Sequence, residues 1–301
     1  MAGGWTAFAL LGRTWWQLLV AVFLAVMATQ VAFVGHDAGH RQVCGSRRGA
    51  GLIGRIHGNL LTGLSYGWWT ARHNRHHAHP NQEGRDPDIA SMVLAFTPAQ
   101  ARARRGAAAW LARHQAWLFF PMLLLEGINL HVAGVRALAR RRGTSVRLAE
   151  AALLALHFGS YLGAVFVVLA PLHALAFIAV QQAVFGLYMG SSFAPNHKGM
   201  MVLGRDEKPD YLRSQVLTSR NIRGNWLTDL LLGGLNYQIE HHLFPSMPRP
   251  SLRHAQAPVR AFCAAHGIPY CETSLLSSYA TVLRHLHAAG ARDVAVRGPL
   301  I

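Results

Sequence analysis

The chain is poor in acidic residues and in cysteine. Only 13 of its 301 residues are Asp or Glu, against 29 Lys and Arg, which gives a formal net charge of +16 with neutral histidines. The three cysteines, Cys44, Cys263 and Cys271, form no Cys-x-x-Cys pair. This spacing excludes a cysteine-ligated iron–sulfur cluster and a zinc knuckle, and we expect reduced thiols without a disulfide.

Charged residues are scarce overall, whereas apolar residues are abundant. They make up 14% and 51% of the chain respectively, a balance typical of integral membrane proteins. A basic chain can bind nucleic acid, but these cations lie beside apolar segments, as in the cytosolic loops of membrane proteins. The sequence also shows no internal repeat, no low-complexity linker and no convincing cleavable signal peptide. We therefore predict a single membrane domain over residues 1–301 that does not bind nucleic acid.

Seven of the 18 histidines fall into three short clusters. Residues three and four apart share a helix face, and imidazole suits iron, zinc, copper and nickel. Three ligand groups exceed what one tetrahedral zinc needs, so the pattern predicts two metal ions. The clusters read His36-Asp-Ala-Gly-His40, His73-Asn-Arg-His76-His77 and Gln238-Ile-Glu-His241-His242.

Three apolar stretches are long enough to cross a membrane, which takes about 20 residues. They cover residues 15–34, 150–170 and 172–190, and Pro171 separates the last two into a helical hairpin. Two further stretches, 51–69 and 117–135, carry polar residues, and we expect them to be interfacial or re-entrant. Cations flank 117–135 on both sides and favour the cytosol: Arg102, Arg104, Arg105, Arg136, Arg140, Arg141, Arg142 and Arg147.

The amino-terminal residues 3–12 are apolar but too short to cross a hydrocarbon core about 30 Å thick. Either a first spanning helix is truncated here, or the amino terminus lies outside and the chain has three spans. From residue 195 onward the chain is polar, and we expect a cytosolic cap over 195–301. Within it, 251–266 and 275–289 have the periodicity of amphipathic helices, and 228–235 is a short interfacial segment.

The histidine pattern resembles the membrane fatty acid desaturase and hydroxylase superfamily. The wider strings GHDAGH (35–40), RHNRHHAHPN (72–81) and NYQIEHHLFP (236–245) carry the resemblance, which extends over about residues 15–290. Gln238, in place of a first histidine in the third cluster, is typical of front-end desaturases and of some bacterial acyl-CoA or acyl-lipid desaturases. The resemblance implies an all-α integral membrane protein whose cytosolic helical cap holds a di-iron site at the cytoplasmic membrane.

The same resemblance implies the metal ligands. They are His36, His40, His73, His76, His77, His197, His241 and His242. No further catalytic residue is expected, and Asn196 could hold a metal-bound water. Ligating histidines usually donate their second ring proton to a carboxylate or carbonyl, so Asp37, Asp229 and Glu240 are candidate partners. Gln238 is either a weak ligand or a hydrogen-bond partner, and the second role is slightly favoured.

The chemistry implied is O2-dependent desaturation of a fatty acyl-CoA or acyl-lipid by two iron ions (Fe2+/Fe3+). The chain contains neither a nucleotide-binding Rossmann unit nor a His-Pro-Gly-Gly haem domain, so electrons must come from another protein, a ferredoxin or a flavin/iron–sulfur reductase. Aromatic residues near the clusters could line an acyl tunnel: Tyr66, Trp68, Trp69, Trp226 and Tyr237. Two alternatives remain, a fatty acid, sphingolipid or carotenoid hydroxylase on the same motifs, and a metal transporter.

Overall fold

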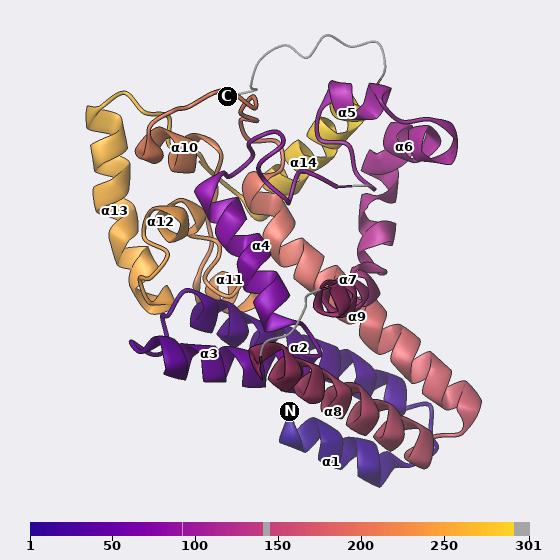
Figure 1. Cartoon of the computed structure of the whole chain (residues 1–301). Coiled ribbons are helices and arrows are strands. Elements are labelled where there is room, and N and C mark those ends of the chain that lie inside the picture. Colours follow the sequence, from indigo (N-terminus) through magenta and orange to yellow (C-terminus); the bar gives the residue numbers. More distant parts are fainter. Residues whose placement is uncertain (92, 141–144, 292–301) are drawn as a thin grey trace. The chain divides into compact units, whose positions relative to one another are not determined.

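The computed structural model describes residues 1–91, 93–140 and 145–291, which are mostly helical (Figure 1). The chain forms two compact units. Unit 1 comprises Met1–Ala71 and Pro121–Ser191, and unit 2 comprises Arg72–Phe120 and Ser192–Ile301. The helical fold class, with candidate membrane spans, is confirmed.

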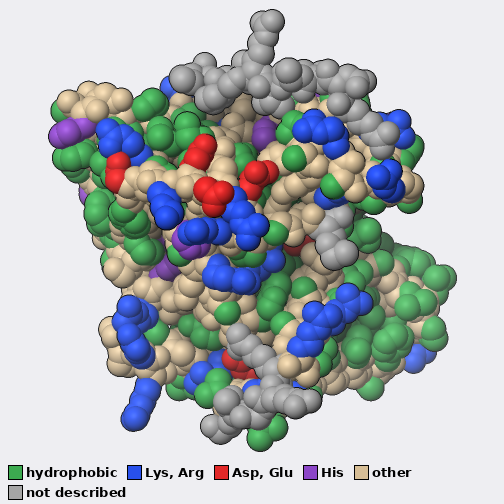
Figure 2. Space-filling view, turned by 45° about the horizontal axis from the view of Figure 1, so that its top comes forward, with side chains coloured by type: hydrophobic (Ala, Val, Ile, Leu, Met, Phe, Trp, Pro, Cys, Tyr) green, Lys and Arg blue, Asp and Glu red, His purple; other side chains and the backbone are tan. Residues whose placement is uncertain are grey.

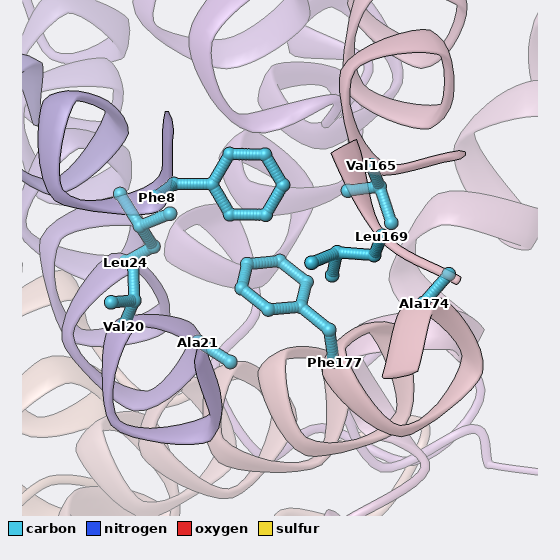
Figure 3. Packing of buried hydrophobic residues seen from close by; sticks show 8 residues of the cluster. All are labelled: Phe8, Val20, Ala21, Leu24, Val165, Leu169, Ala174 and Phe177. Carbon is cyan, nitrogen blue, oxygen red and sulfur yellow. The ribbon is translucent and has the colours of Figure 1, made fainter. Parts of the chain in front are cut away.

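Unit 1 contains the apolar helices. In chain order they are α1 (Ala2–Leu11), α2 (Gln17–Gly39), α3 (Arg47–Arg55), the π-helix η1 (Ile56–Leu61), the start of α4 (Tyr66–Ala78), the end of α6 (Gly106–Leu123), α7 (Glu126–Arg140), α8 (Ser145–Val168) and most of α9 (Pro171–His197). Its core joins α1, α2, α8 and α9 through residues such as Phe8, Leu24, Val165 and Phe177 (Figure 3). The rings of Phe8 and Phe177 meet edge to face, with centroids 5.1 Å apart.

Three described helices are long and apolar enough to cross a membrane: Gln17–Gly39, Val146–Val168 and Pro171–His197. They occupy the three stretches expected to be spans, and Pro171 begins the third helix. The stretch 117–135 falls on α6 and α7, which bend by 85° at the break between them. Arg141 and Arg142 of the cationic run lie outside the described residues. Which helices cross, and in which direction, stays a prediction.

The stretch 51–69 contains no long helix. Ser46 caps α3 by accepting a hydrogen bond from the Gly49 backbone N–H at 3.0 Å, and η1 then ends in an irregular turn. The carbonyls in the last turn of a helix, and in an irregular turn after it, lack partners within the helix, and at membrane depth the protein must supply them. Here His157 Nδ1 donates to the Leu60 carbonyl at 2.8 Å, and His131 Nδ1 donates to the Gly63 carbonyl at 2.9 Å. These two histidines are therefore structural.

The letters of a dinucleotide-binding Gly-x-Gly-x-x-Gly motif do occur at residues 49–54, but these residues lie inside α3. That motif binds a pyrophosphate only where it joins a strand to a helix. The described residues before α3 form a short loop after α2 rather than a strand. The glycines of α3 therefore give no sign of a nucleotide site.

Unit 2 is a set of shorter helices around one small parallel strand pair. It contains the end of α4, α5 (Pro98–Arg102), the start of α6, α10 (Tyr211–Leu217), β1 (Asn221–Ile222), α11 (Trp226–Leu231), α12 (Gln238–Leu243), α13 (Arg249–Ala265), β2 (Glu272–Thr273) and α14 (Leu275–Gly290). β1 pairs with β2 in the register Asn221↔Glu272. The helices predicted at 251–266 and 275–289 are present as α13 and α14.

The third histidine cluster lies at the centre of unit 2. Its helix α12 contacts α10, α13 and β1 (Figure 1), and Ile239 of α12 packs with Val216 and Cys263 in a fully buried core. Hydrophobic packing thus fixes the short helix that carries His241 and His242. A six-residue helix would be unstable in isolation, so packing against its neighbours is what stabilises α12.

Candidate metal centre

In unit 1, the first histidine cluster ends α2. The helix extends through Gly39, so His36 and His40 lie on one face with ring centroids 4.8 Å apart, and both are buried. Burial, reinforced by the charge of His36, lowers the pKa of His40 to about 2. His36 Nδ1 lies 3.3 Å from the carboxylate of Asp37, the residue considered as a candidate partner of a ligand. The His36 ring also packs against Trp69, with centroids 5.4 Å apart.

In unit 2, the second cluster lies on α4 and points its side chains in two directions. His73 and His77, one turn apart, bring their Nε2 atoms within 3.1 Å of each other. His76 is buried and faces His197, the last residue of α9, with 3.3 Å between the two Nε2 atoms. One helix therefore contributes histidines to two groups, whereas the spacing of three and four residues predicts a single shared face.

An aspartate holds His76 in a defined orientation. Asp86 has no exposed surface; it accepts hydrogen bonds from His76 Nδ1 at 2.9 Å, from the Asn81 backbone N–H at 2.7 Å and from the Asp88 backbone N–H at 2.8 Å. Burial disfavours the charged imidazole, but the carboxylates of Asp88 and Asp86 outweigh it and raise the pKa of His76. Because the carboxylate accepts at Nδ1, the lone pair of His76 is on Nε2.

His197 and His242 have the same arrangement. His197 Nδ1 lies 3.0 Å from the Thr218 carbonyl, which can only accept a hydrogen bond. His242 Nδ1 lies 2.9 Å from Gln215 Oε1, and the Gln215 amide is oriented by its own donation to the His77 carbonyl at 3.1 Å. Both rings must therefore carry their proton on Nδ1 and their lone pair on Nε2.

Three imidazole lone pairs consequently converge in a buried space of unit 2. One ring nitrogen from each of His76, His197 and His242 lies within 4.8 Å of the others. Within the described part of the chain, His242 Nε2 is buried without a hydrogen-bond partner. Lone pairs that face each other repel unless a cation or a proton lies between them, so this group can bind a metal ion.

A second histidine group in unit 2 lies beside the first. The ring centroids of His77 and His241 are 4.8 Å apart, and those of His73 and His241 are 6.3 Å apart. His77 also stacks on His242 at 4.2 Å, which joins the two groups. Unit 2 thus presents six of the eight predicted ligands, and unit 1 presents the pair His36 and His40.

Two other predicted site residues, Gln238 and Asn196, form hydrogen bonds beside His197. Gln238 places its amide nitrogen 2.9 Å from His197 Nε2, while its oxygen accepts from the side chain of Asn196 at 2.9 Å. Gln238 and a metal ion would therefore compete for the same lone pair. Asn196 is fully buried and contacts Gln238 rather than a histidine.

Two predicted carboxylates bond elsewhere. Glu240 accepts from Asn221 at 2.7 Å and from the Tyr270 hydroxyl at 2.8 Å, and burial raises its pKa. Asp229 accepts from the side chain of Asn236 at 2.8 Å. Both contacts fix the scaffold around the third cluster and do not orient a histidine.

The residues that do orient the histidines of unit 2 escaped the sequence analysis. Asp86 was not among the carboxylates predicted as partners, and Gln215 and Thr218 belong to no motif. Asn81, with a left-handed φ of 51°, turns the chain after α4 so that Asp86 returns to His76. Pro80 and Asn81 are both residue types that favour turns, which is consistent with the carboxylates after them folding back toward α4.

Comparison with known proteins identifies relatives along most of the chain. A family model described as fatty acid desaturase matches residues 13–274. An acyl-lipid (9-3)-desaturase of Physcomitrium patens is 31% identical over 281 residues, covering 89% of this chain and 52% of the relative. A Delta(5) fatty acid desaturase of Caenorhabditis elegans is 31% identical over 263 residues, covering 83% and 58%.

A Delta(8)-fatty-acid desaturase of Euglena gracilis is 32% identical over 276 residues, covering 88% of this chain and 66% of the relative. The chain thus spans between about half and two thirds of the length of these relatives. The match includes all three histidine clusters and His197.

Proposed function

The chain belongs to the fatty acid desaturase family, and from this membership we propose that it is an O2-dependent fatty acyl desaturase with a di-iron centre. The ligands are the eight histidines at positions 36, 40, 73, 76, 77, 197, 241 and 242. The observation that carries the proposal is the convergence of the His76, His197 and His242 lone pairs, each ring fixed by a hydrogen bond at its other nitrogen.

The reaction explains why such a site is needed. A methylene C–H in an alkyl chain is not acidic, so a general base cannot remove its proton. Two bound iron ions supply, with O2, an oxidant strong enough to take hydrogen atoms from the chain. In the overall stoichiometry, one O2 takes up two hydrogen atoms from neighbouring carbons, together with two electrons and two protons from outside the substrate, and two water molecules form. The chain gains one cis double bond.

The protein's own groups hold the ligands in place. Asp86 fixes the ring of His76, the Thr218 carbonyl fixes His197, and Gln215 fixes His242. Such partners set the tautomer, orient the ring and raise the basicity of the ligand nitrogen. All three are themselves buried, so water does not compete for these hydrogen bonds.

Substrate and partners follow from the family and from charge. The named relatives act on acyl lipids and fatty acids at different positions, and we propose a membrane acyl-CoA or acyl-lipid as the substrate here. Electrons come from a ferredoxin or a flavin/iron–sulfur reductase. Lys and Arg far outnumber Asp and Glu on the face shown in Figure 2, which suits an acidic donor. We place the protein in the cytoplasmic membrane with its site facing the cytosol.

Two alternatives differ in product or in ligand position. A hydroxylase would use the same site but insert oxygen instead of removing a second hydrogen. A transporter would place its ligands inside the spans near the midplane. In this chain His40 follows the end of α2, His197 is the last residue of α9, and the other clusters lie on the shorter helices α4 and α12, which favours an enzyme.

Expression in a host that lacks its own desaturase tests the proposal. We expect a new unsaturated acyl species, which is absent with His76→Ala and retained with His266→Ala, a control at an exposed histidine of unit 2. Fragmentation of the product gives the double-bond position. A hydroxylated species would instead identify a hydroxylase, and equal product from His76→Ala would remove the histidine site from the chemistry.

A further inference from the structure

Helix α11 of unit 2 exposes its apolar side chains, whereas a helix surrounded by water ordinarily buries them. Four of its six residues are large and apolar, and all four are exposed. The exposed fractions are 74% for Trp226, 44% for Leu227, 52% for Leu230 and 44% for Leu231. The two polar residues between them, Thr228 and Asp229, are only partly exposed.

The polar residues attach the helix to the rest of unit 2. Asn225 and Thr228 form a reciprocal capping box at the first turn. Asp229 accepts a hydrogen bond from the Asn236 side chain at 2.8 Å, and its carbonyl accepts from the Gly234 N–H at 2.7 Å. A surface helix ordinarily buries its apolar stripe and exposes its polar one. Here the hydrogen bonds face inward and the apolar side chains face outward.

Such a surface needs an apolar exterior. Contiguous apolar patches on soluble surfaces mark contacts with proteins or membranes, and this chain carries three helices suited to a membrane. Trp226 begins the helix, and the exposed Arg223 precedes it. Tryptophan prefers the headgroup level of a bilayer, and arginine is attracted to anionic lipid phosphates. This combination of side chains matches an interfacial segment.

We propose that α11 inserts into the headgroup–acyl boundary of the lipid bilayer and anchors unit 2 there through Trp226, Leu227, Leu230 and Leu231. The anchor is an interaction surface for lipid, independent of whether the chain desaturates an acyl chain. It also revises the expectation that Trp226 lines an acyl tunnel, because a side chain with 74% of its surface exposed lines no enclosed space in this structure.

The anchor is connected to the third histidine cluster by a short, hydrogen-bonded link. Gly233 and Gly234 reverse the chain with φ of 60° and 71°, a conformation that favours glycine. The Leu235 carbonyl then accepts from the side chain of Asn196, next to His197. The Asn236 carbonyl accepts from the Ile222 N–H at 2.9 Å, and α12 begins at Gln238. Insertion of α11 therefore sets the depth of the third cluster relative to the bilayer surface.

Fluorescence in lipid tests this anchor directly. The purified full chain, carrying Cys44→Ser and Cys271→Ser to remove the two partly exposed thiols, receives the substitution Leu230→Cys and an environment-sensitive NBD label. It is reconstituted into vesicles of phosphatidylcholine and phosphatidylglycerol, with and without doxyl-labelled lipid. Asp206→Cys, in an exposed charged loop of the same unit, is the matched control, and Leu231→Cys replaces Leu230→Cys if that variant fails to fold.

We expect the label at residue 230 to emit at shorter wavelength than the label at 206, and to be quenched by doxyl lipid but not by aqueous iodide. Quenching by iodide at 230 equal to that at 206 would overturn the proposal. A blue shift that disappears on dilution of the protein in lipid, without doxyl quenching, would instead identify a second copy of the chain as the partner. Neither readout requires bound iron or desaturase activity.

Discussion

The substitution Asp86→Asn tests whether the hydrogen bond to His76 supports metal binding. The carboxylate accepts three hydrogen bonds, two of them at Oδ2. The amide of asparagine has the same shape but only one acceptor oxygen. If that oxygen still accepts the hydrogen bonds from His76 and Asn81, the NH2 group must face the Asp88 N–H, which is also a donor. One buried donor then loses its partner, at a cost of about 1–3 kcal/mol in unfolding free energy.

The expected effect on metal affinity is of similar size. Loss of a partner that orients a ligand typically lowers metal affinity by about 10–100-fold, equivalent to roughly 1.4–2.7 kcal/mol. The assay is iron retained per chain after dialysis against increasing concentrations of a chelator, with thermal unfolding measured in parallel. Asp88→Asn is the matched control, because its carboxylate lies 3.5 Å from His76 Nδ1 and is 42% exposed.

We expect Asp86→Asn to lose iron at a lower chelator concentration than the parent chain, and Asp88→Asn to lose much less. Equal retention by Asp86→Asn and the parent would refute the reasoning that this carboxylate supports the site. Equal losses by both variants would show that net charge, and not the hydrogen bond to His76, is responsible.

Three further predictions concern other parts of the chain. Hydrogen bonds from Ser46 lower the pKa of Cys44, whereas burial raises the pKa of Cys271. Iodoacetamide should therefore alkylate Cys44 at lower pH than Cys271, and Ser46→Ala should move the pH profile of Cys44 alkylation to higher pH. Faster labelling of Cys271 than of Cys44 would contradict this. Arg220 is 2% exposed and donates to the Ser278 hydroxyl and to backbone carbonyls on both sides of His197. Arg220→Met should lower the unfolding free energy by about 1–3 kcal/mol, because the Lys198 carbonyl loses its guanidinium donor, while the Pro195 carbonyl keeps the Ser278 hydroxyl as a donor; an unchanged denaturation midpoint would count against it. A Cβ on Gly39 would lie 2.7 Å from the Trp69 ring, so Gly39→Ala should lower the melting temperature, with an overpacking cost of about 1–3 kcal/mol; an unaltered melting curve would show that the ring can move aside.

The sequence predicted what depends on periodicity and ligand spacing. Apolar runs located the three long helices, and Pro171 located the break between two of them. The separations of three and four residues in His73, His76 and His77 predicted one shared helix face; His73 and His77 do approach each other, but His76 turns to His197 instead. These features are local, since a helix converts spacing directly into a shared face.

The partners of the histidines could not be predicted in the same way. Thr218 and Gln215 reach His197 and His242 only because α9, α10 and α12 pack together, and no spacing in the chain records this. Sequence proximity was misleading for Glu240, which neighbours His241 yet bonds to Asn221 and Tyr270. The turn after η1 was likewise unforeseen, because the histidines that satisfy its carbonyls, 131 and 157, come from distant helices.

The most direct test of the proposed function follows both hydrogens of the target bond. The chain is loaded with iron and supplied with O2, a reduced ferredoxin and a saturated acyl substrate fully deuterated along its alkyl chain. Mass spectrometry should find a product that has lost two neighbouring deuterium atoms and gained no oxygen, and this product should be absent with His76→Ala. A product that has lost one deuterium and gained one oxygen atom would contradict desaturation and establish hydroxylation instead.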